Sequence, residues 1–575
     1  MDMQSDRSME PGERPGGVQP SPVGAAQPLA RVIGVSGAKI TVQFSSDASR
    51  SLADVTVGDL LAVRSRRSLV VGILGDVLGS GPADGRRDSQ PIGHVDLLGE
   101  ILCTASGEQW FERGVTCYPT IGSDVGLVGE TELRLMFGSE GADGIVVGRL
   151  RDERSVAACI RVDHMLQRHF AVLGSTGSGK SSAVAVILRE VMAARPNLRV
   201  LLIDTHDEYH RSFGEGAFIL RPQNFRLPHW LFSFDEIVHI IFGRHSQVAQ
   251  EVGLLSELIP LAKNEYRRSR GAERTGYRGS ELESAGYSVD TPVPYRLEDL
   301  IALIESRMGK LENNAIAVHY QRLLARINVA RTNRRFSFIF DNEGDGLAEI
   351  VSQLFRLQPD GPSMTIVQTA GLPVEVFDPV VSALFRLAFE FGLHTGAALP
   401  LLVVCEEAHH YAHADRSLGF HPAREGLSRI AKEGRKHGVF LGLVTQRPAE
   451  LDPTLLSQCG TVFAMRMANE ADQSVVRAAL TDPTNRLLDF LPSLATRDAL
   501  AFGEGVPVAV RMRFDELPAA LVPKRAGRDH VQPGAKLDNG FVSALVARWR
   551  GGAVAAAPAA PNVGLSAYGA RAGSR

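Results

Sequence analysis

The spacing of hydrophobic positions changes near residue 163. Before it, short apolar runs such as 31–35, 39–44 and 68–74 alternate with polar positions and are separated by Gly-rich turns. A series of short, regularly spaced runs is typical of an antiparallel β domain. The pattern therefore predicts a small barrel or sandwich over residues 29–163.

Beyond residue 163, nearly continuous apolar runs alternate with helical patterns. The expected strands cover residues 170–173, 199–203, 336–340, 401–404, 440–444 and 462–465. Continuous apolar strands that are joined through helices indicate a parallel sheet covered on both faces. The fold class expected is therefore α/β, with a core formed by residues 164–222 and 336–521.

The two core segments are separated by residues 223–335, where apolar positions recur at helical spacing, as at Leu297, Leu300 and Ile304. This pattern predicts a helical insertion. The insertion carries a basic loop with nearby tyrosines, which comprises Arg267, Arg268, Arg270, Arg274, Arg278, Tyr266 and Tyr277. Such a loop is either a solvated surface or a contact for nucleic acid through phosphate neutralisation and stacking.

Both ends of the chain are poor in large apolar residues. Residues 1–28 are rich in Pro, Gly, Ser and Gln, and the sequence after about residue 551 is rich in Ala, Gly and Pro. Segments of this kind bury too little apolar surface to offset the entropy of ordering. We expect a disordered tail at 1–28 and a largely disordered C-terminal segment at 522–575.

Composition narrows the functional classes. The 62 basic and 65 acidic residues give a net charge of −3, which excludes a generally basic nucleic-acid coat but not a local basic channel. The five cysteines are far apart and form no CxxC pair, which indicates a reducing, cytoplasmic compartment. No run of 18 apolar residues is present, so no membrane span is expected.

A phosphate-binding loop follows the first core strand. Residues 174–181 read Gly-Ser-Thr-Gly-Ser-Gly-Lys-Ser, between an apolar strand and a good helix former. The candidate nucleotide-binding residues are Gly174, Ser175, Thr176, Gly177, Ser178, Gly179, Lys180, Ser181 and Ser182. In this motif the backbone N–H groups surround the phosphates, the lysine reaches the β and γ phosphates, and the hydroxyl of Ser181 ligates Mg²⁺. ATP and Mg²⁺ are therefore expected.

Two further strands end in residues suited to the same site. The strand at 401–404 is followed by Glu406 and Glu407, and the strand at 440–444 is followed by Gln446. The carboxyl ends of parallel strands lie at the ligand-binding edge of such a sheet. We expect Glu406 in the Mg²⁺ shell, Glu407 to polarise the attacking water, and Gln446 to sense the γ-phosphate.

Histidines follow the acidic pair directly, at 409, 410 and 413. His409 and His413 would lie one turn apart on a helix, which suggests a metal cluster when considered alone. No HExxH motif and no second group of ligands with matching spacing accompany them. A polar helix start beside the nucleotide site is the simpler interpretation.

Taken together, these motifs resemble the HerA branch of the HerA/FtsK ATPase superfamily. The resemblance rests on Arg168 to Ser181, on the run 204–209 (Asp-Thr-His-Asp-Glu-Tyr), on 405–409, on 433–438 and on 444–448. Asp207 stands where the family often has Gly. The resemblance implies a RecA-like P-loop core, an N-terminal HAS-type β-barrel, a helical-bundle insertion, and a C-terminal segment that embraces a neighbouring subunit.

The resemblance also implies an assembly and an activity. Members form homohexameric rings around double-stranded DNA and hydrolyse ATP between subunits. Arg168 then matches the family position for an arginine supplied in trans, and Arg435 is a second such residue.

Three functions follow from the family. The first is a DNA translocase or helicase that works with a separate nuclease. The second is an antiphage scaffold or regulator whose effector is a sirtuin-type NADase or a nuclease. The third, a secretion or conjugation ATPase, is disfavoured by the missing membrane segment.

Overall fold

The computed structural model describes most of the chain between residues 28 and 524, together with residues 543 and 546. The undescribed stretches inside that range are 46–54, 67, 80–89, 105, 139–142, 152, 244–247, 272–285, 311–313, 342–345, 359 and 480–483. The tails expected to be disordered fall almost entirely outside the described residues, as do Arg274, Tyr277 and Arg278 of the basic loop. In the described part, no helix is long and apolar enough to cross a membrane.

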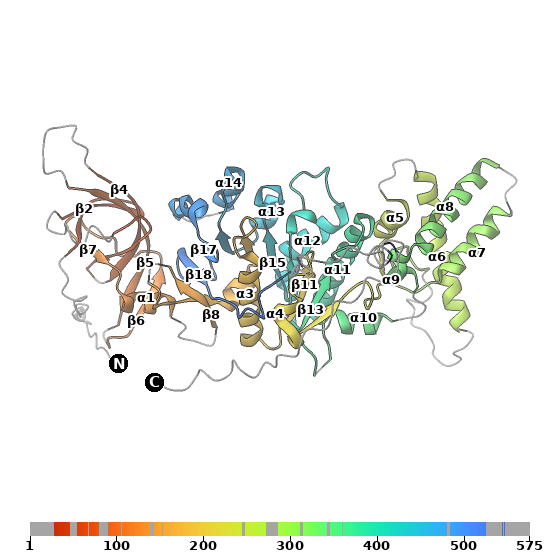
Figure 1. The fold of residues 1–575 in the computed structure, drawn as a ribbon, viewed down its shortest axis with the longest axis horizontal. Coiled ribbons are helices and arrows are strands. Elements are labelled where there is room, and N and C mark those ends of the chain that lie inside the picture. The colour runs from red at the N-terminus through yellow and green to blue at the C-terminus, as the bar shows by residue number, and fades with distance from the viewer. Residues whose placement is uncertain are drawn as a thin grey trace, which may run out of the picture. The chain divides into compact units, whose positions relative to one another are not determined.

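The chain forms two compact units. The first comprises residues 1–159, 480–490 and 506–512, and the second comprises the remainder. Figure 1 labels many of the elements of both units.

The first unit contains an antiparallel barrel. Its strands are β1 (Ala30–Ser36), β2 (Lys39–Phe44), β3 (Leu60–Arg64), β4 (Leu69–Leu78), β5 (Ile92–Cys103), β6 (Gln109–Arg113) and β7 (Asp124–Leu127). They pair in the order β2-β1-β7-β3-β4-β5-β6, and β2 also pairs with β5. The additional pairing closes six strands on themselves and leaves β6 outside. The unit therefore contains a barrel rather than a sandwich.

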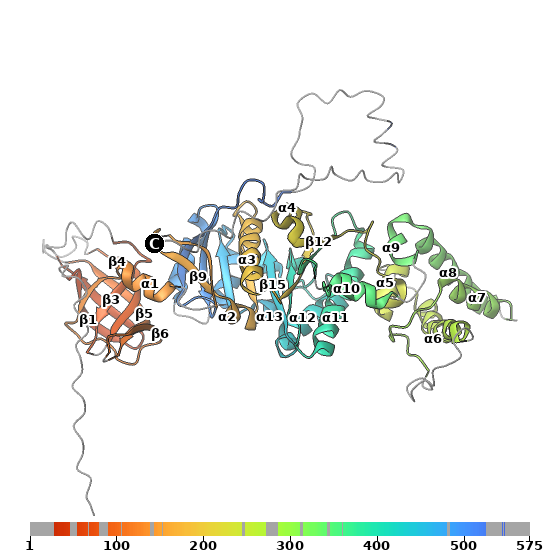
Figure 2. The same cartoon turned by 90° about the horizontal axis from the view of Figure 1, so that it is seen from below.

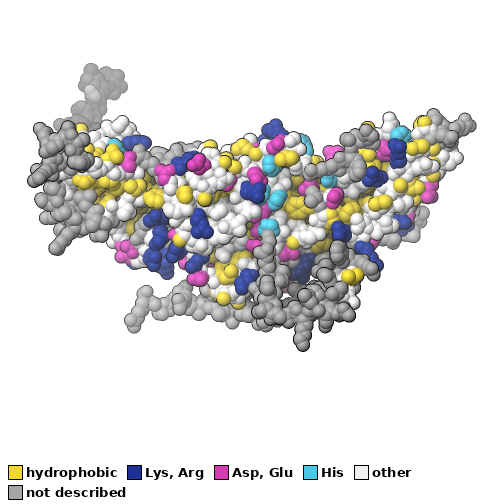
Figure 3. Space-filling view, turned by 45° about the horizontal axis from the view of Figure 1, so that its top comes forward, with side chains coloured by type: hydrophobic (Ala, Val, Ile, Leu, Met, Phe, Trp, Pro, Cys, Tyr) yellow, Lys and Arg dark blue, Asp and Glu magenta, His cyan; other side chains and the backbone are white. Residues whose placement is uncertain are grey.

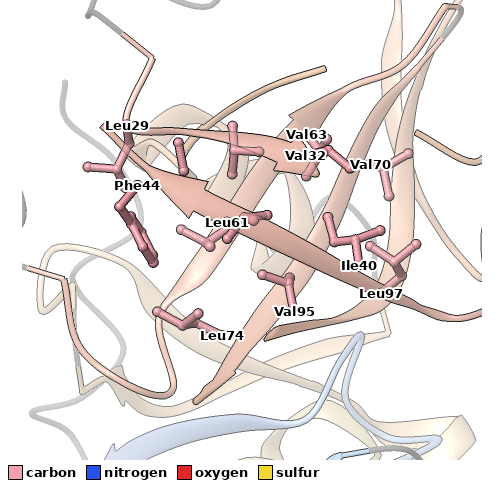
Figure 4. Close-up of a cluster of buried hydrophobic side chains, with 13 residues drawn as sticks. Leu29, Val32, Ile40, Phe44, Leu61, Val63, Val70, Leu74, Val95 and Leu97 are labelled. Atoms are coloured by element: carbon pink, nitrogen blue, oxygen red, sulfur yellow. The ribbon is translucent and has the colours of Figure 1, made fainter. Parts of the chain in front are cut away.

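Alternation along these strands fills the barrel. In β2 the side chains of Ile40, Val42 and Phe44 are buried, whereas the positions between them are more exposed. They join an apolar cluster that also includes Leu61, Val63, Val70, Leu74, Val95 and Val125. The side chains of this cluster that Figure 4 labels point into the barrel. Because the strand period is two residues, the same alternation that was read from the sequence places one face of each strand in this core.

Four further elements lie wholly or partly in the first unit. They are α1 (Glu130–Phe137), β8 (Gly144–Leu150), β9 (Ala157–Arg161) and β18 (Val510–Phe514), and the last three pair in the order β18-β8-β9.

A sheet organises the second unit. Its strands are β10 (Phe170–Leu173), β11 (Arg199–Asp204), β12 (Ala217–Leu220), β13 (Met364–Gln368), β14 (Leu401–Cys405), β15 (Val439–Thr445), β16 (Thr461–Met465) and β17 (Asp498–Gly503). They pair in the order β12-β13-β11-β14-β15-β10-β16-β17, in parallel except for β16 with β17. The central strands β10, β14 and β15 are almost wholly buried, as expected for a sheet with two covered faces.

Helices cover this sheet on two sides. The helices next to it are α2 (Val162–Gln167), α3 (Lys180–Ala194), α4 (His210–Phe213), α11 (Val374–Thr395), α12 (His421–Glu433), α13 (Pro453–Leu456) and α14 (Glu470–Ala479). Figure 2 shows α3 and α4 on one side and α11 and α12 on the other. The parallel, two-sided sheet expected from the apolar runs is confirmed.

The segment between β12 and β13 is helical. It contains α5 (Phe234–Phe242), α6 (Ala249–Gly271), α7 (Leu297–Met308), α8 (Asn314–Thr332), α9 (Ser337–Phe340) and α10 (Leu347–Leu354). A capping box starts α5, because Ser233 and Glu236 each bond the other's backbone N–H.

One strand expected in the core is wrong. Residues 336–340 form the end of a 3-10 turn and then α9, not a strand. Phe338 and Phe340 are buried against the insertion: Leu227 N–H donates to the Phe338 carbonyl at 3.0 Å, and the Phe340 ring lies 6.0 Å from that of His229. A short apolar run does not distinguish a buried strand from a buried helical turn. The strand position beside β11 is filled by β13.

Candidate active site

Residues 174–182 comprise the loop 174–179, which connects β10 to α3 at the carboxyl edge of the sheet, and the first residues of α3. Gly177 and Gly179 have φ angles of 76° and 101°, a left-handed region that favours glycine. Gly174 N–H donates to the Thr445 carbonyl at 3.3 Å, and Ser175 N–H donates to the Arg466 carbonyl at 2.8 Å. The loop is therefore held by the residues that end β15 and β16, and it leads into the N-terminus of α3, a favourable place for an anion.

Lys180 lies at the start of α3 and is directed back over the loop. Its Nζ donates to the Ser175 carbonyl at 3.2 Å. Burial lowers the pKa of Lys180, and the carboxylates of Glu407, Glu406 and Glu208 act in the opposite direction. The carboxylates therefore offset part of the cost of burying a charged lysine beside the loop.

Next along the helix, Ser181 contacts a third acidic residue. Its hydroxyl donates to Glu208 Oε2 at 3.0 Å. Glu208 follows β11, one strand away from the acidic pair in the sheet order, so three strand ends and α3 converge on one cluster.

Glu406 is buried, with 4% of its surface exposed. Its Oε2 accepts the backbone N–H and the hydroxyl of Thr205 at 3.2 and 3.3 Å. Burial, together with the charges of Asp204 and Glu208, raises the pKa of Glu406 well above its usual range. Burial also raises the pKa of Asp204, so this pair disfavours two negative charges and would gain from a cation.

The pKa of Glu407, unlike that of Glu406, is lowered. Burial acts to raise its pKa, but hydrogen bonding to His206, the proximity of His409 and Lys180, and the Gln446 N–H together lower it. Glu407 Oε2 accepts the Gln446 N–H at 3.4 Å, and its Oε1 lies 3.7 Å from His206 Nε2. A buried carboxylate that stays ionised is suited to orient and polarise a water molecule.

Gln446 closes the cluster from the end of β15. The Thr176 hydroxyl of the loop donates to Gln446 Oε1 at 2.5 Å. The structure thus brings together Lys180, Ser181, Glu406, Glu407 and Gln446 around the loop of residues 174–182.

Arg168 and Arg435 are not part of this cluster. Arg168 precedes β10, and Arg435 lies in the 3-10 turn before β15, so both are at the amino edge of the sheet. Five residues of mostly extended chain lie between Arg168 and Gly174, a span of roughly 20 Å. Arg168 Nη1 pairs instead with Glu504 Oε1 at 2.7 Å.

The chain is also similar in sequence to known proteins. Residues 145–388 match the family model described as the central domain of helicase HerA. Over this central part the chain is similar to helicase HerA, and the chain is a P-loop ATPase. It is 26% identical over 422 residues to the DNA double-strand break repair helicase HerA of Pyrococcus furiosus. The aligned region covers 67% of this chain and 72% of that protein. The HerA of Sulfurisphaera tokodaii is 27% identical over 413 residues, with 70% and 75% covered.

Solved structures also align with the chain, at low identity. VirB4 of Thermoanaerobacter pseudethanolicus aligns with a TM-score of 0.46 at 14% identity, over 66% of this chain and 98% of that one. The bacterial conjugative coupling protein TrwB aligns with a TM-score of 0.44 at 12% identity, over 69% and 94% of the two chains.

The cluster of the HerA-like core fits a magnesium nucleotide. The Ser178 hydroxyl is buried and has no hydrogen-bond partner among the described residues. Glu406 and Asp204 lie where a cation would relieve their repulsion. In the described ranges no three His, Cys, Asp or Glu side chains form a cage for a metal. In nucleotide sites Mg²⁺ is usually held by one or two protein oxygens together with phosphates.

The histidines do not form the helical pair that their spacing suggested. His409 lies in a three-residue 3-10 turn, Ala408–His410, and His413 lies beyond it and forms an isolated bridge with Leu451. His409 is buried beside Glu407 and Thr445. The expectation of an i, i+4 helical pair is therefore wrong.

Asp207 is the residue at which the sequence departs from the expected family pattern. Its backbone nevertheless adopts the left-handed region, with φ 54°. Asp tolerates this conformation better than most side chains. The loop after β11 thus has the shape that a glycine would allow.

Sequence reasoning missed several residues that touch the site. Glu208 bonds Ser181, and Arg497 N–H donates to the Ser178 carbonyl at 2.9 Å. Glu208 could have been found, because it closely follows a parallel strand. Arg497 gives no local signal, because its contact depends on how β17 folds back onto the core.

Figure 3 shows one face of the molecule by side-chain type. Histidine side chains gather there among acidic and basic ones in the middle of the visible face.

Proposed function

We propose that this HerA-like ATPase is a homohexameric motor that binds ATP with Mg²⁺ and moves along double-stranded DNA, together with a separate effector such as a nuclease or a sirtuin-type NADase. The observation that carries the proposal is the convergence of Lys180, Glu406, Glu407 and Gln446 on the 174–182 loop. Relatives that carry the name of DNA double-strand break repair helicases support DNA as the track.

Each residue of the cluster has a distinct task in this proposal. The loop N–H groups and Lys180 bind the phosphates and neutralise charge on the transferred phosphoryl group. Ser181 and Glu406 hold Mg²⁺, which when bound screens the phosphate charge. Glu407 orients the attacking water, and Gln446 senses whether the γ-phosphate is present.

The domain assignment is part of the same proposal. Residues 29–163 act as the collar of the ring, residues 164–222 and 336–521 form the motor core, and residues 223–335 are an appended helical bundle.

DNA dependence is the direct test of the motor function. Duplex DNA is expected to raise the steady-state ATPase rate of the wild-type protein, and the rise should shrink with added salt because phosphate contacts release counterions. The measurement is phosphate release with and without a long duplex, alongside a DNA-binding titration. Neither binding nor stimulation at low salt would contradict a role as a DNA motor.

An arginine supplied by a neighbour is the second test. Arg168 and Arg435 lie at the sheet edge away from their own loop, so in a ring they would serve an adjacent subunit. Neither Arg168→Ala nor Lys180→Ala should hydrolyse ATP alone, whereas mixed subunits should recover a fraction of the rate. The fraction should follow the number of interfaces that keep both residues.

Arg435→Ala tests the second arginine in the same mixture. No recovery at any mixing ratio, for either arginine, would show that neither acts in trans.

A further inference from the structure

The backbone and side chain of Glu407 are held in an unusual way. Glu407 has φ 49° and ψ 49°, in the left-handed region that a residue with a Cβ rarely adopts. Such conformations persist only when the surrounding structure enforces them, and they gather at functional sites. Neighbouring groups must therefore hold Glu407 in this conformation.

His409 is one of these groups. It has 4% of its surface exposed, and its Nδ1 lies 3.4 Å from Glu407 Oε2 and 2.9 Å from Thr445 Oγ1. Burial beside His410 lowers the pKa of His409 to about 4, so the ring is neutral at physiological pH. A neutral imidazole carries a proton on one nitrogen only.

The neighbours of Nδ1 decide which nitrogen carries the proton. The Glu407 carboxylate can only accept a hydrogen bond, whereas the Thr445 hydroxyl, which accepts the Arg447 N–H at 3.0 Å, can serve Nδ1 either as the acceptor of a second bond or as a donor. A bare Nδ1 would place its lone pair against the Glu407 carboxylate. Protonation at Nδ1 instead lets the ring donate toward both Thr445 and Glu407.

We propose that His409 is a positioning residue that, through Nδ1–H, fixes the Glu407 carboxylate and ties it to the end of β15. This inference rests on the proposed hydrolysis of ATP at Glu407. The same strand end supplies the Gln446 N–H to Glu407 and the Thr445 carbonyl to Gly174 of the loop. His409 thus links the water-polarising carboxylate to the segment that carries the γ-phosphate sensor.

The expected consequence is a loss of rate without a loss of binding. In His409→Ala the Glu407 carboxylate is free to rotate, and misplacement of a catalytic group by about 1 Å costs roughly 10²-fold in rate. We expect kcat for ATP to fall by about that factor, whereas KM and the affinity for a fluorescent ADP analogue stay within about twofold.

His409→Asn is the conservative variant. The Asn amide can place an N–H close to the position of Nδ1, so it is expected to restore most of the kcat that alanine loses. His410→Ala is the matched control, because His410 is the adjacent histidine in the same turn and is exposed. Its kcat should remain near the wild-type value.

Glu407→Gln separates this inference from the function on which it rests. If Glu407→Gln hydrolyses ATP normally, the role of Glu407 is wrong. If Glu407→Gln is inactive while folded His409→Ala keeps full kcat, the positioning role alone is overturned. If His409→Ala loses ADP binding and unfolds at a much lower temperature, and Asn does not restore kcat, His409 is a packing residue and the proposal fails.

Discussion

Replacing Lys180 by alanine is expected to reduce ATP hydrolysis by roughly 10²–10³-fold and to weaken nucleotide binding. Removal of one well-placed donor from a site that stabilises developing negative charge has an effect of this size. Lys180 Nζ is already held over the loop by the Ser175 carbonyl, so little rearrangement is needed to meet a phosphate. The rate is measured as phosphate release at saturating Mg²⁺ and ATP.

The same substitution is not expected to lower stability. Lys180 is a positive charge within a cluster that contains Glu406, Glu407 and Glu208. Because burial outweighs the carboxylates and lowers the pKa of Lys180, the charged lysine costs the folded state free energy at neutral pH, so the nucleotide-free variant should unfold at the same temperature as wild type or a higher one.

Lys310→Ala is a suitable control, because Lys310 is exposed and lies in the helical insertion. Hydrolysis by Lys180→Ala at the wild-type rate would contradict the assignment of the site.

The two adjacent glutamates are expected to respond differently to the same change. Glu407→Gln should lower kcat by roughly 10²–10⁴-fold, the range for loss of a group that assists proton transfer, while ATP binding is retained. Glu406→Gln should instead raise the Mg²⁺ concentration needed for half-maximal activity, because a carboxylate oxygen of the metal shell is replaced by an amide.

Thermal stability is a second property expected to distinguish the Glu406 variant. Glu406→Gln removes a carboxyl group from a buried acidic cluster, so the nucleotide-free variant should unfold at the same temperature as wild type or a higher one. The measurements are a Mg²⁺ titration of activity, binding of a fluorescent ATP analogue, and thermal unfolding without nucleotide. Equal loss of kcat in both variants with unchanged Mg²⁺ dependence would remove the distinction between their roles.

Much of the site was predictable because its residues follow buried strands. Glu406 and Glu407 follow β14, Gln446 follows β15, and the loop follows β10. In a parallel sheet these carboxyl ends share one edge, so sequence position alone brings the side chains to one region. The contacts between them did not follow from sequence, because they depend on rotamers and on the twist of the sheet.

Residues 336–340 show the limit of the sequence pattern. Their apolar run is compatible with a strand or a helical turn, and the choice was made by packing against residues 225–231 of the insertion. β13 carries a comparable apolar run at 364–368, and it forms the strand because it pairs with both β11 and β12.

The sequence by itself determined the α/β class, the barrel-like N-terminal region and the phosphate loop with its following acidic pair. These features depend on local periodicity and on motifs whose chemistry needs particular residues at fixed spacing. Tertiary structure alone decided the ionisation of Glu406 and Glu407, the place of His409 beside Glu407, and the separation of Arg168 from its own loop. Burial, hydrogen bonding and charge act through space, so residues distant in sequence fix them.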